Sequence, residues 1–451
     1  MTQAASAGSA RRALFGALSW CAVLGASGLA NAHGAFPQSA YVYGDPSDAE
    51  RLWIGTSFGL LRSDDGGESF RWLCEEAPDY EGVKPRMAVT ADGSLLIGSF
   101  DGVSVSRDAG CDWAAPEGPK DRFVSSLFTT PHDPNGALAM VSTGMPGGVF
   151  LNQVWVTGDN GQSFTQRGAD LEPGMLAFSL MSATSDPSRL YLTGNVRGEA
   201  GVATGQLGVS RDGGLSWDYL PIPGADSTHP PHLLAIHPGD AEQLFVRVDG
   251  PEEDVLLWSQ DAGLTFTELL RKPSELFGFV IDPDLNRVRV GFGNAADRRR
   301  NVEVGIYSAA LKELGTASFA QDLEGPIGCL TWLNGQLYAC TSQFFHGYEL
   351  GRSSDGRQFE GVMTLAGVEG VASCGEGTRA AQVCPAKWPE NCNLIGRCGQ
   401  VEPPDAGPDA GPMPNAPPAR RSGCQLTQGG NAGASWLLLS LGLLFARRRR
   451  R

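Results

Sequence analysis

The sequence predicts an all-β fold, a seven-bladed β-propeller built from four-stranded blades. Two independent markers give the same count of seven. One is a short polar motif that recurs along the chain, and the other is a turn signal followed each time by an alternating apolar strand. The composition agrees, because 60 Gly, 29 Pro and only 19% charged residues suit an all-β chain with many turns better than a helical one.

The recurring motif has the pattern Ser/Thr-x-Asp-x-Gly-x-x-aromatic, and its full copies begin about 43 to 53 residues apart. Five full copies and one copy shortened by a residue occupy residues 63–70, 106–113, 157–164, 210–217, 259–266 and 353–359. The gap before the last copy leaves room for a decayed one near residues 307–319. Seven units of blade length follow from this spacing.

The second marker is a two-residue turn signal that occurs once in each unit. The seven signals are Asp45-Pro46, Asp92-Gly93, Asp133-Pro134, Asp186-Pro187, His237-Pro238, Asp282-Pro283 and Asn334-Gly335. Strands with alternating apolar residues follow them, as at residues 51–54, 95–97, 189–192 and 287–290. Each unit therefore contains four short strands.

The chemistry of the motif suits a tight hairpin turn. Its Ser/Thr hydroxyl and Asp carboxylate can bond the local backbone, its Gly can adopt a positive φ, and its aromatic residue can pack the turn onto the blade. Over about residues 36–365 the chain resembles the Asp-box, or BNR, repeat proteins: sialidases, the sortilin ectodomain, photosystem II stability factors and xyloglucan-active glucanases. The resemblance implies that each motif joins the third and fourth strands of its blade, on the face opposite those families' active sites.

The same resemblance implies a structural role for the motif aspartates, which are Asp65, Asp108, Asp159, Asp212, Asp261 and Asp355. Calcium binding is the alternative, but each turn offers one carboxylate where calcium takes six to eight oxygen ligands. The histidines His229, His232 and His237 lack a converging further ligand, so structural roles are expected for them too. We predict no metal and no cofactor.

Eight of the ten cysteines remain once Cys21 in the N-terminal segment and Cys424 near the C-terminus are set aside. An even number in an exported protein indicates disulfides. Pairing outward from the Asn334-Gly335 turn places Cys329 opposite Cys340, within bridging distance. The expected second pair is between neighbouring repeats, Cys74 with Cys111. The other four staple the segment after the last repeat, with their connectivity left open: Cys374, Cys384, Cys392 and Cys398. A zinc site from these four is the alternative, and the absence of close CxxC spacing disfavours it.

The N-terminus has the form of an export signal. Arg11 and Arg12 precede an uncharged apolar stretch at residues 13–29, and a small-x-small cleavage site ends at Ala32. We therefore expect cleavage after Ala32. A retained membrane anchor is the alternative, and the Gly and Ser residues that interrupt the stretch favour the signal peptide.

The C-terminus combines a stalk with an anchor. Residues 402–419 are rich in Pro, Ala, Gly and Asp and predict an extended stalk. Cys424, a short apolar run at residues 436–446 and five terminal arginines follow. This three-part arrangement resembles the MYXO-CTERM sorting signal of myxobacterial surface proteins, which implies a processing protease and attachment through Cys424. A retained tail anchor is the alternative, since terminal arginines can hold a short apolar run in a membrane by snorkelling.

These features divide the chain into a signal peptide (1–32), a propeller (33–366), a Cys-rich extension (367–400), a stalk (401–423) and a sorting tail (424–451). The formal net charge is −15, and removal of both ends takes away arginines but no acidic residue. Such a surface disfavours nucleic acid as a partner. We expect a monomer that is exported to the cell surface.

The loops between the second and third strands form the candidate binding surface, because they emerge opposite the motif turns. They are short in the first two repeats and expected to be longer later, as at residues 143–148 and 194–206. Arg298, Arg299 and Arg300 in a later loop are suited to an anionic sugar or a carboxylate. The remaining candidates, suited to stacking on a sugar ring, are Phe344, Phe345, His346 and Tyr348. Ordinary solvated loops are the alternative.

The sequence favours a binding module over an enzyme. It has no Arg-Ile-Pro motif of the kind found in sialidases, one propeller's worth of repeats where xyloglucanase-type enzymes use two, and no GxSxG, Walker or HExxH motif. The expected ligand is a polysaccharide or a surface protein. A glycoside hydrolase is the alternative, because carboxylates from distant blades leave no local signal. A purely structural envelope component is the third hypothesis.

Overall fold

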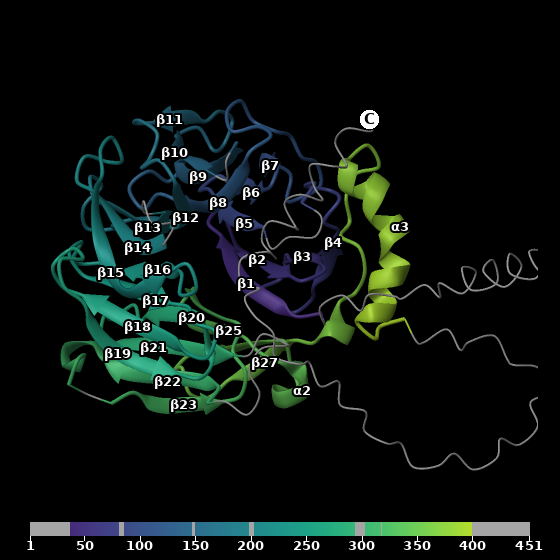
Figure 1. The fold of residues 1–451 in the computed structure, drawn as a ribbon. Coiled ribbons are helices and arrows are strands. Elements are labelled where there is room, and N and C mark those ends of the chain that lie inside the picture. The colour runs from purple at the N-terminus through teal and green to yellow at the C-terminus, as the bar shows by residue number, and fades with distance from the viewer. Residues whose placement is uncertain are drawn as a thin grey trace, which may run out of the picture. The chain divides into compact units, whose positions relative to one another are not determined.

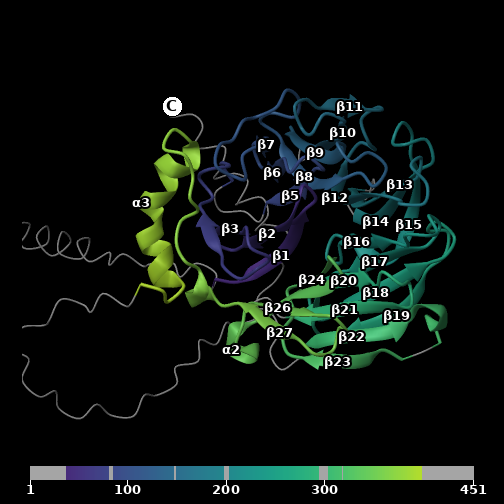
Figure 2. The same cartoon turned by 180° about the vertical axis from the view of Figure 1, so that it is seen from behind.

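The computed structural model describes residues 37–80, 85–146, 149–197, 203–293, 303–316 and 318–398. All of them belong to the first of two units of the chain, residues 1–400. Within this unit the strands form seven antiparallel sheets that follow one another around a common centre (Figures 1 and 2). The predicted seven-bladed β-propeller is confirmed.

Each blade is one continuous segment of chain whose strands pair in sequence order. Blades 1 to 4 comprise β1 (Ser39–Asp45), β2 (Asp48–Thr56), β3 (Gly59–Ser63), β4 (Arg71–Leu73); β5 (Arg86–Val89), β6 (Leu95–Ser99), β7 (Gly102–Ser106); β8 (Phe123–Thr129), β9 (Ala137–Met145), β10 (Val149–Thr157), β11 (Thr165–Arg167); and β12 (Met175–Ser182), β13 (Leu190–Arg197), β14 (Ala203–Ser210), β15 (Asp218–Asp226). Blades 5 to 7 comprise β16 (Pro231–Ile236), β17 (Leu244–Val248), β18 (Asp254–Ser259), β19 (Thr267–Lys272); β20 (Glu275–Ile281), β21 (Arg287–Gly293), β22 (Gly305–Ala310), β23 (Ala320–Glu324); and β24 (Cys329–Leu333), β25 (Gln336–Cys340), β26 (Leu350–Ser353), β27 (Glu360–Met363). The first strands contact one another around the ring, so they line its centre.

Blade 2 departs from the four-stranded prediction. Its sheet has three strands, and a single bridge between Val105 and Ala114 stands in place of the fourth. The chain reaches Pro116 two residues later, and proline has no N–H to donate to a ladder. The fourth strand therefore cannot extend.

The repeated motif follows the third strand of its blade in every copy that the structure describes, and in every such blade except blade 2 the fourth strand follows the motif. The residue in its fourth position has a positive φ, for example 70° at Gly66 and 56° at Ala109. The backbone N–H of Gly66 donates to the carbonyl of Glu50 at 2.8 Å, next to the turn between the first two strands. The motif turns and the first turns therefore share one face of the propeller.

At two places on the opposite face, the described chain continues as paired strand where a loop was expected. Residues 194–206, expected to be a loop, are mostly strand, because β13 and β14 stay paired as far as Arg197 and Ala203. In the same way β9 and β10 stay paired as far as Met145 and Val149. The expectation of long loops was wrong at both places, because much of each expected loop continues the antiparallel ladder.

After blade 7 the chain crosses to the outer edge of blade 1. Val371 forms a parallel bridge with Trp72 of β4, and the Trp72 N–H donates to the Gly370 carbonyl at 2.7 Å. The helix α3 (Arg379–Leu394) then lies beside this blade, with Trp388 5.6 Å from the Trp72 ring (Figures 1 and 2). Two short 3-10 turns (Leu311–Glu313 and Leu365–Gly367) and the four-residue helix α2 (Gln343–His346) complete the described helices.

Four disulfides involve all eight of the predicted cysteines. Cys329 is joined to Cys340 across β24 and β25, as the hairpin register predicted. The predicted Cys74–Cys111 pair is wrong. These two cysteines lie in neighbouring blades, but each faces the extension that covers both, and the bonds are Cys74–Cys384 and Cys111–Cys374. The fourth bond, Cys392–Cys398, lies within the extension. The extension thus fastens the end of blade 7 covalently to blades 1 and 2, and we call it the clasp.

Candidate functional site

The aspartates of the repeated motif are engaged by their own turns. Asp65 Oδ1 accepts hydrogen bonds from the Ser69 N–H (2.9 Å) and the Ser63 hydroxyl (2.7 Å), and its Oδ2 accepts one from the Ser69 hydroxyl (2.5 Å). The same bonds recur in three further copies. Burial opposes ionisation of Asp159, but the donors of Ser163 and Thr157 outweigh it and lower its pKa to about 2. These carboxylates stabilise turns, and none of them is poised for proton transfer.

Exposed apolar side chains gather on the face opposite the motif turns. Ten large apolar side chains are exposed among the described residues, and six of them lie in the turns, projecting strand ends or inner-strand starts of this face. They are Phe100, Phe123, Met145, Phe277, Phe344 and Phe345. Five of the six are aromatic, which is the side-chain type that dominates binding surfaces. This distribution makes the face the candidate functional surface.

Of the predicted ligand-binding residues, the aromatic group is described and the basic group is not. Arg298, Arg299 and Arg300 lie outside the described residues. The aromatic group is formed by α2 and the residue that follows its C-cap: Phe345 packs 5.0 Å from His346, which packs 5.7 Å from Tyr348. His346 Nε2 lies 2.9 Å from the Glu324 carbonyl of blade 6. The three rings therefore form one cluster at the junction of blades 6 and 7.

A second aromatic group, absent from the sequence predictions, lies between blades 2 and 3. Phe100 stacks on Phe123 with ring centroids 4.8 Å apart, and the two side chains are 48% and 36% exposed. Next to them the Arg122 guanidinium lies 5.7 Å from the centre of the Trp155 ring and donates to Gln153 Oε1 at 2.5 Å. We call these five residues the blade 2–3 platform. Phe100 at a hairpin tip was visible in the sequence, whereas its contact with Phe123 forms only through the packing of blades 2 and 3.

One histidine of the HPPHLLAIH segment reaches the inner strands. His232 of β16 packs 5.3 Å from Phe178 of β12 and pairs across the ladder with Arg247. Burial, together with the positive charges of Arg247 and Arg86, lowers the pKa of His232 to about 3. The ring is therefore neutral under physiological conditions. His229 and His237 lie beyond the two ends of the same strand, so the three histidines do not converge.

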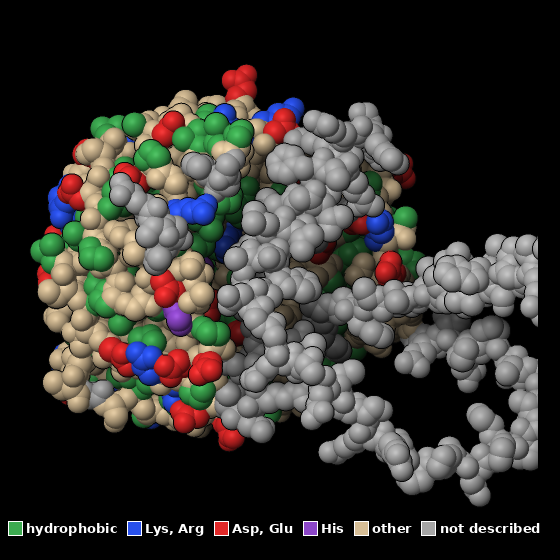
Figure 3. All heavy atoms as spheres, in the orientation of Figure 1, with side chains coloured by type: hydrophobic (Ala, Val, Ile, Leu, Met, Phe, Trp, Pro, Cys, Tyr) green, Lys and Arg blue, Asp and Glu red, His purple; other side chains and the backbone are tan. Residues whose placement is uncertain are grey.

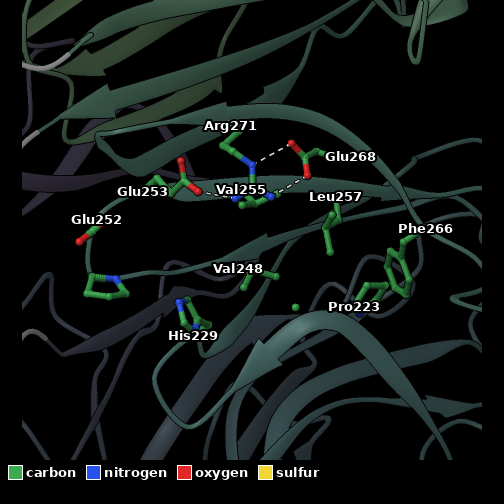
Figure 4. Close-up of a pocket in the computed structure, with 12 residues that line it drawn as sticks. Pro223, His229, Val248, Glu252, Glu253, Val255, Leu257, Phe266, Glu268 and Arg271 are labelled. Atoms are coloured by element: carbon green, nitrogen blue, oxygen red, sulfur yellow. Dashed lines mark hydrogen bonds and ion pairs between the residues drawn. The ribbon is translucent and has the colours of Figure 1, made fainter. Parts of the chain in front are cut away.

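A pocket of about 450 Å³ opens between blades 4 and 5 (Figure 4). One wall is formed by β18 and β19, with Val255 and Leu257 facing the space, and Pro223 and His229 lie across from it. Arg271 Nε and Nη2 bind Glu268 at 2.9 and 2.7 Å, and Arg271 Nη1 binds Glu253. Figure 3 shows acidic and basic side chains grouped beside a histidine over this part of the ring. The pocket is apolar inside and charged at its rim.

The carboxyl groups with a raised pKa are buried among backbone donors. Burial raises the pKa of Asp254, which accepts bonds from the Leu276 N–H at 2.7 Å and the Gly250 N–H at 3.3 Å. Burial also raises the pKa of Glu349, which accepts a bond from the Ser39 N–H and so joins blade 7 to blade 1. Hydrogen bonds from Arg271 lower the pKa of Glu268 in the pocket. In the described part of the chain, no carboxyl group with a raised pKa is therefore placed to protonate a ligand.

The described residues contain no group of three or more His, Cys, Asp or Glu side chains arranged to hold a metal ion. In the same ranges, no helix is long and apolar enough to cross a membrane.

Comparison with known proteins shows the fold alone. No protein-family model matches the sequence, and a search of curated proteins finds no relative. Among solved structures, an ancestral GH74 enzyme matches with a TM-score of 0.54 and 17% identity, covering 72% of this chain and 46% of that one. A GH74 xyloglucanase from Xanthomonas campestris is also similar, with a TM-score of 0.49 and 15% identity over 71% of this chain and 52% of that one. A Hadza microbial sialidase matches with a TM-score of 0.41 and 14% identity over 65% of this chain and 71% of that one. The chain spans about half the length of the two GH74 proteins.

Proposed function

We propose that this protein is an exported, surface-anchored β-propeller that binds a polysaccharide on the face opposite its motif turns. One observation carries the proposal: exposed aromatic side chains collect on that face, and two of them stack beside an arginine in the blade 2–3 platform. Aromatic faces offer sugar rings a large apolar contact at a small cost in side-chain entropy. Arg122 has no carboxylate partner among the described residues, and its guanidinium adds hydrogen-bond donors.

The same face argues for binding in preference to hydrolysis. A glycosidase needs two accessible carboxyl groups, one of which has a raised pKa so that it can act as general acid. The carboxyl groups of Asp254 and Glu349, whose pKa is raised, accept hydrogen bonds from backbone N–H groups. Glu253 and Glu268 both accept hydrogen bonds from the Arg271 guanidinium. Hydrolysis is the second candidate because the ancestral GH74 enzyme shares the propeller fold. Xyloglucan is the first polysaccharide to test, because the repeated motif resembles that of xyloglucan-active glucanases.

The repeat and the tail complete the proposal. We assign the recurring motif to the Asp-box type, since its turns have the bonds that such a motif requires and hold none of the proposed ligand contacts. An export signal cleaved after Ala32 and a MYXO-CTERM-like tail processed near Cys424 would display the propeller on its stalk. Mass spectrometry of the two termini of the protein recovered from the cell surface tests both cleavages.

The binding test uses the purified full-length protein and a panel of xyloglucan, other polysaccharides and sialylated glycans. Retention of the protein and release of sugar are both followed, the latter by mass spectrometry. We expect retention without release, and we expect Phe100→Ala to weaken it about three- to tenfold, the range for one aromatic contact. The matched control is Leu264→Ala, which removes an apolar side chain that is even more exposed than Phe100 from a motif turn on the other face.

The outcomes separate the candidates. Loss of retention in Phe100→Ala but not in Leu264→Ala supports the platform, and the same assay with Arg298→Ala and Phe344→Ala tests the two groups that the sequence indicated. Equal retention of the Phe100 variant and its control would remove the platform from the site. Release of sugar by the unmodified protein would replace the binding module with a glycoside hydrolase.

A further inference from the structure

We propose that the pocket between blades 4 and 5 binds an extended peptide in which a hydrophobic side chain lies next to a lysine or arginine. This site is formed by β15, β17, β18 and β19 and shares no residue with the blade 2–3 platform. It does not depend on the proposed polysaccharide binding. Its volume of about 450 Å³ falls within the ~300–1,000 Å³ of ordinary ligand pockets.

The wall formed by β18 and β19 places apolar groups inside and charged groups at the rim. Val255 pairs across the ladder with Arg271, and Leu257 pairs with Glu268. Val255 and Leu257 are two residues apart on one strand, so they face the same side about 6.6 Å apart. Each pair thus puts its apolar member on the inner strand and its charged member on the outer strand. A slot of this kind suits an extended chain with one apolar side chain inserted.

The rim has an excess of negative charge. Glu252, Glu253 and Glu268 line the pocket, and Arg271 is the lining residue with a permanent positive charge. The Arg271 guanidinium is already bound by both Glu253 and Glu268, as Figure 4 shows. One cation shared by two carboxylates, with a third carboxylate beside them, leaves the rim net negative. A cationic side chain of the ligand therefore complements the rim, and an anionic one is repelled.

The opposite wall exposes main chain. In β15 the ladder with β14 is interrupted, because Gln206 pairs with Pro221 whereas Thr204 pairs with Asp226. The residues between Pro221 and Asp226 bulge out, and Gly224 lines the pocket with a φ of 74° and nothing within 4 Å of where a Cβ would stand. An accessible backbone beside an apolar slot offers polar partners to a peptide main chain. This feature favours a peptide over a compact apolar amine.

The test measures binding of fluorescein-labelled Gly-Phe-Lys-Gly and Gly-Phe-Glu-Gly peptides to the full-length protein by fluorescence anisotropy. We expect the lysine peptide to bind at least about fivefold more tightly, and its affinity to fall at high salt, since the contacts at the rim are solvent-exposed. Glu252→Lys is expected to weaken the lysine peptide by about five- to tenfold. Glu376→Lys, a charge reversal at an exposed glutamate of the clasp, is the matched control and is expected to change nothing.

Three results would overturn the proposal. The first is equal affinity for the two peptides, which removes the charge argument. The second is an equal effect of Glu252→Lys and Glu376→Lys, which places the peptide elsewhere or makes its binding depend on net charge alone. The third is complete displacement of the labelled lysine peptide by phenethylamine at the same concentration as the peptide, which would assign the pocket to small amphipathic amines.

Discussion

Replacing Arg289 by methionine is expected to destabilise the propeller more than loss of an exposed arginine. The side chain of Arg289 on β21 is 5% exposed and holds two carboxylates, with Nε 2.9 Å from Asp282 Oδ1 and Nη1 2.9 Å from Asp322 Oδ2. It also donates to the carbonyls of Asp355 and Gly356, at 3.1 Å each, in the motif turn of blade 7. One guanidinium therefore ties blade 6 to blade 7.

The size of the effect follows from burial. Removing one partner of a buried ion pair leaves an uncompensated charge and costs about 3–5 kcal/mol. Methionine keeps most of the aliphatic volume, so the lost charge and hydrogen bonds account for the change. The matched control is Arg211→Met, whose partner is Asp218. Those side chains are 48% and 75% exposed, and such a pair contributes about 0–1 kcal/mol.

Equilibrium unfolding in urea, followed by tryptophan fluorescence, measures both variants without screening their ion pairs. The free energy of unfolding is expected to fall by several kcal/mol for Arg289→Met, with an unchanged dependence on urea concentration. Equal losses in Arg289→Met and Arg211→Met would refute the reasoning. The junction between blades 6 and 7 would then rest on apolar packing alone.

Two further predictions concern the motif and the clasp. Asp159→Asn is expected to destabilise the fold at pH 7 but not near pH 2. The pKa of Asp159 is lowered to about 2 from an ordinary 3.8, so its contribution to the free energy of unfolding is present above pH 4 and is lost as the pH falls through 2. Urea midpoints of the variant and the unmodified protein at three pH values measure this contribution. A difference in midpoint that does not change with pH would contradict the prediction. Removing the Cys74–Cys384 bond by alanine substitution is expected to lower the free energy of unfolding by about 2–4 kcal/mol. Removing Cys111–Cys374 as well is expected to lower it more than either single removal, because each bond by itself keeps the two ends of the ring joined. Thermal midpoints without reductant test this, with a variant lacking Cys392–Cys398 as control, and equal midpoints for the single and double removals would refute it.

The blades could be predicted because their markers are local. A Ser, Asp and Gly at fixed spacing specify a turn without help from the rest of the chain, and the Asn334-Gly335 turn sets the register that brings Cys329 to Cys340. The pairing of Cys74 and Cys111 failed because it depends on where a distant segment lies. Nothing near either cysteine indicates that residues 374–384 return to blades 1 and 2.

The candidate site was predictable at the level of a face, and less so at the level of residues. Phe344, Phe345, His346 and Tyr348 lie on the expected face because their loop connects two strands whose order was predicted. Phe123, at the start of the inner strand of blade 3, and Trp155, in the third strand of the same blade, have ordinary strand sequences. Phe100 joins them only because blades 2 and 3 pack side by side, and a single sequence contains no sign of that contact.

The motif also joins neighbouring blades, which favours the proposed location of ligand binding on the other face. The carbonyl of its fourth residue accepts an arginine from the preceding blade at four junctions, to Ala109, Asn160, Gly213 and Gly356. These arginines come from four different places: Arg62 in a third strand, Arg107 in a motif, Arg167 in a fourth strand and Arg289 in a second strand. The carbonyl acceptor therefore occupies the same motif position at each of these junctions, whereas the arginine donor comes from a different position in its blade each time. A face whose turns are engaged both within and between blades has little freedom to vary, whereas the opposite face can change its hairpin tips without loosening the ring.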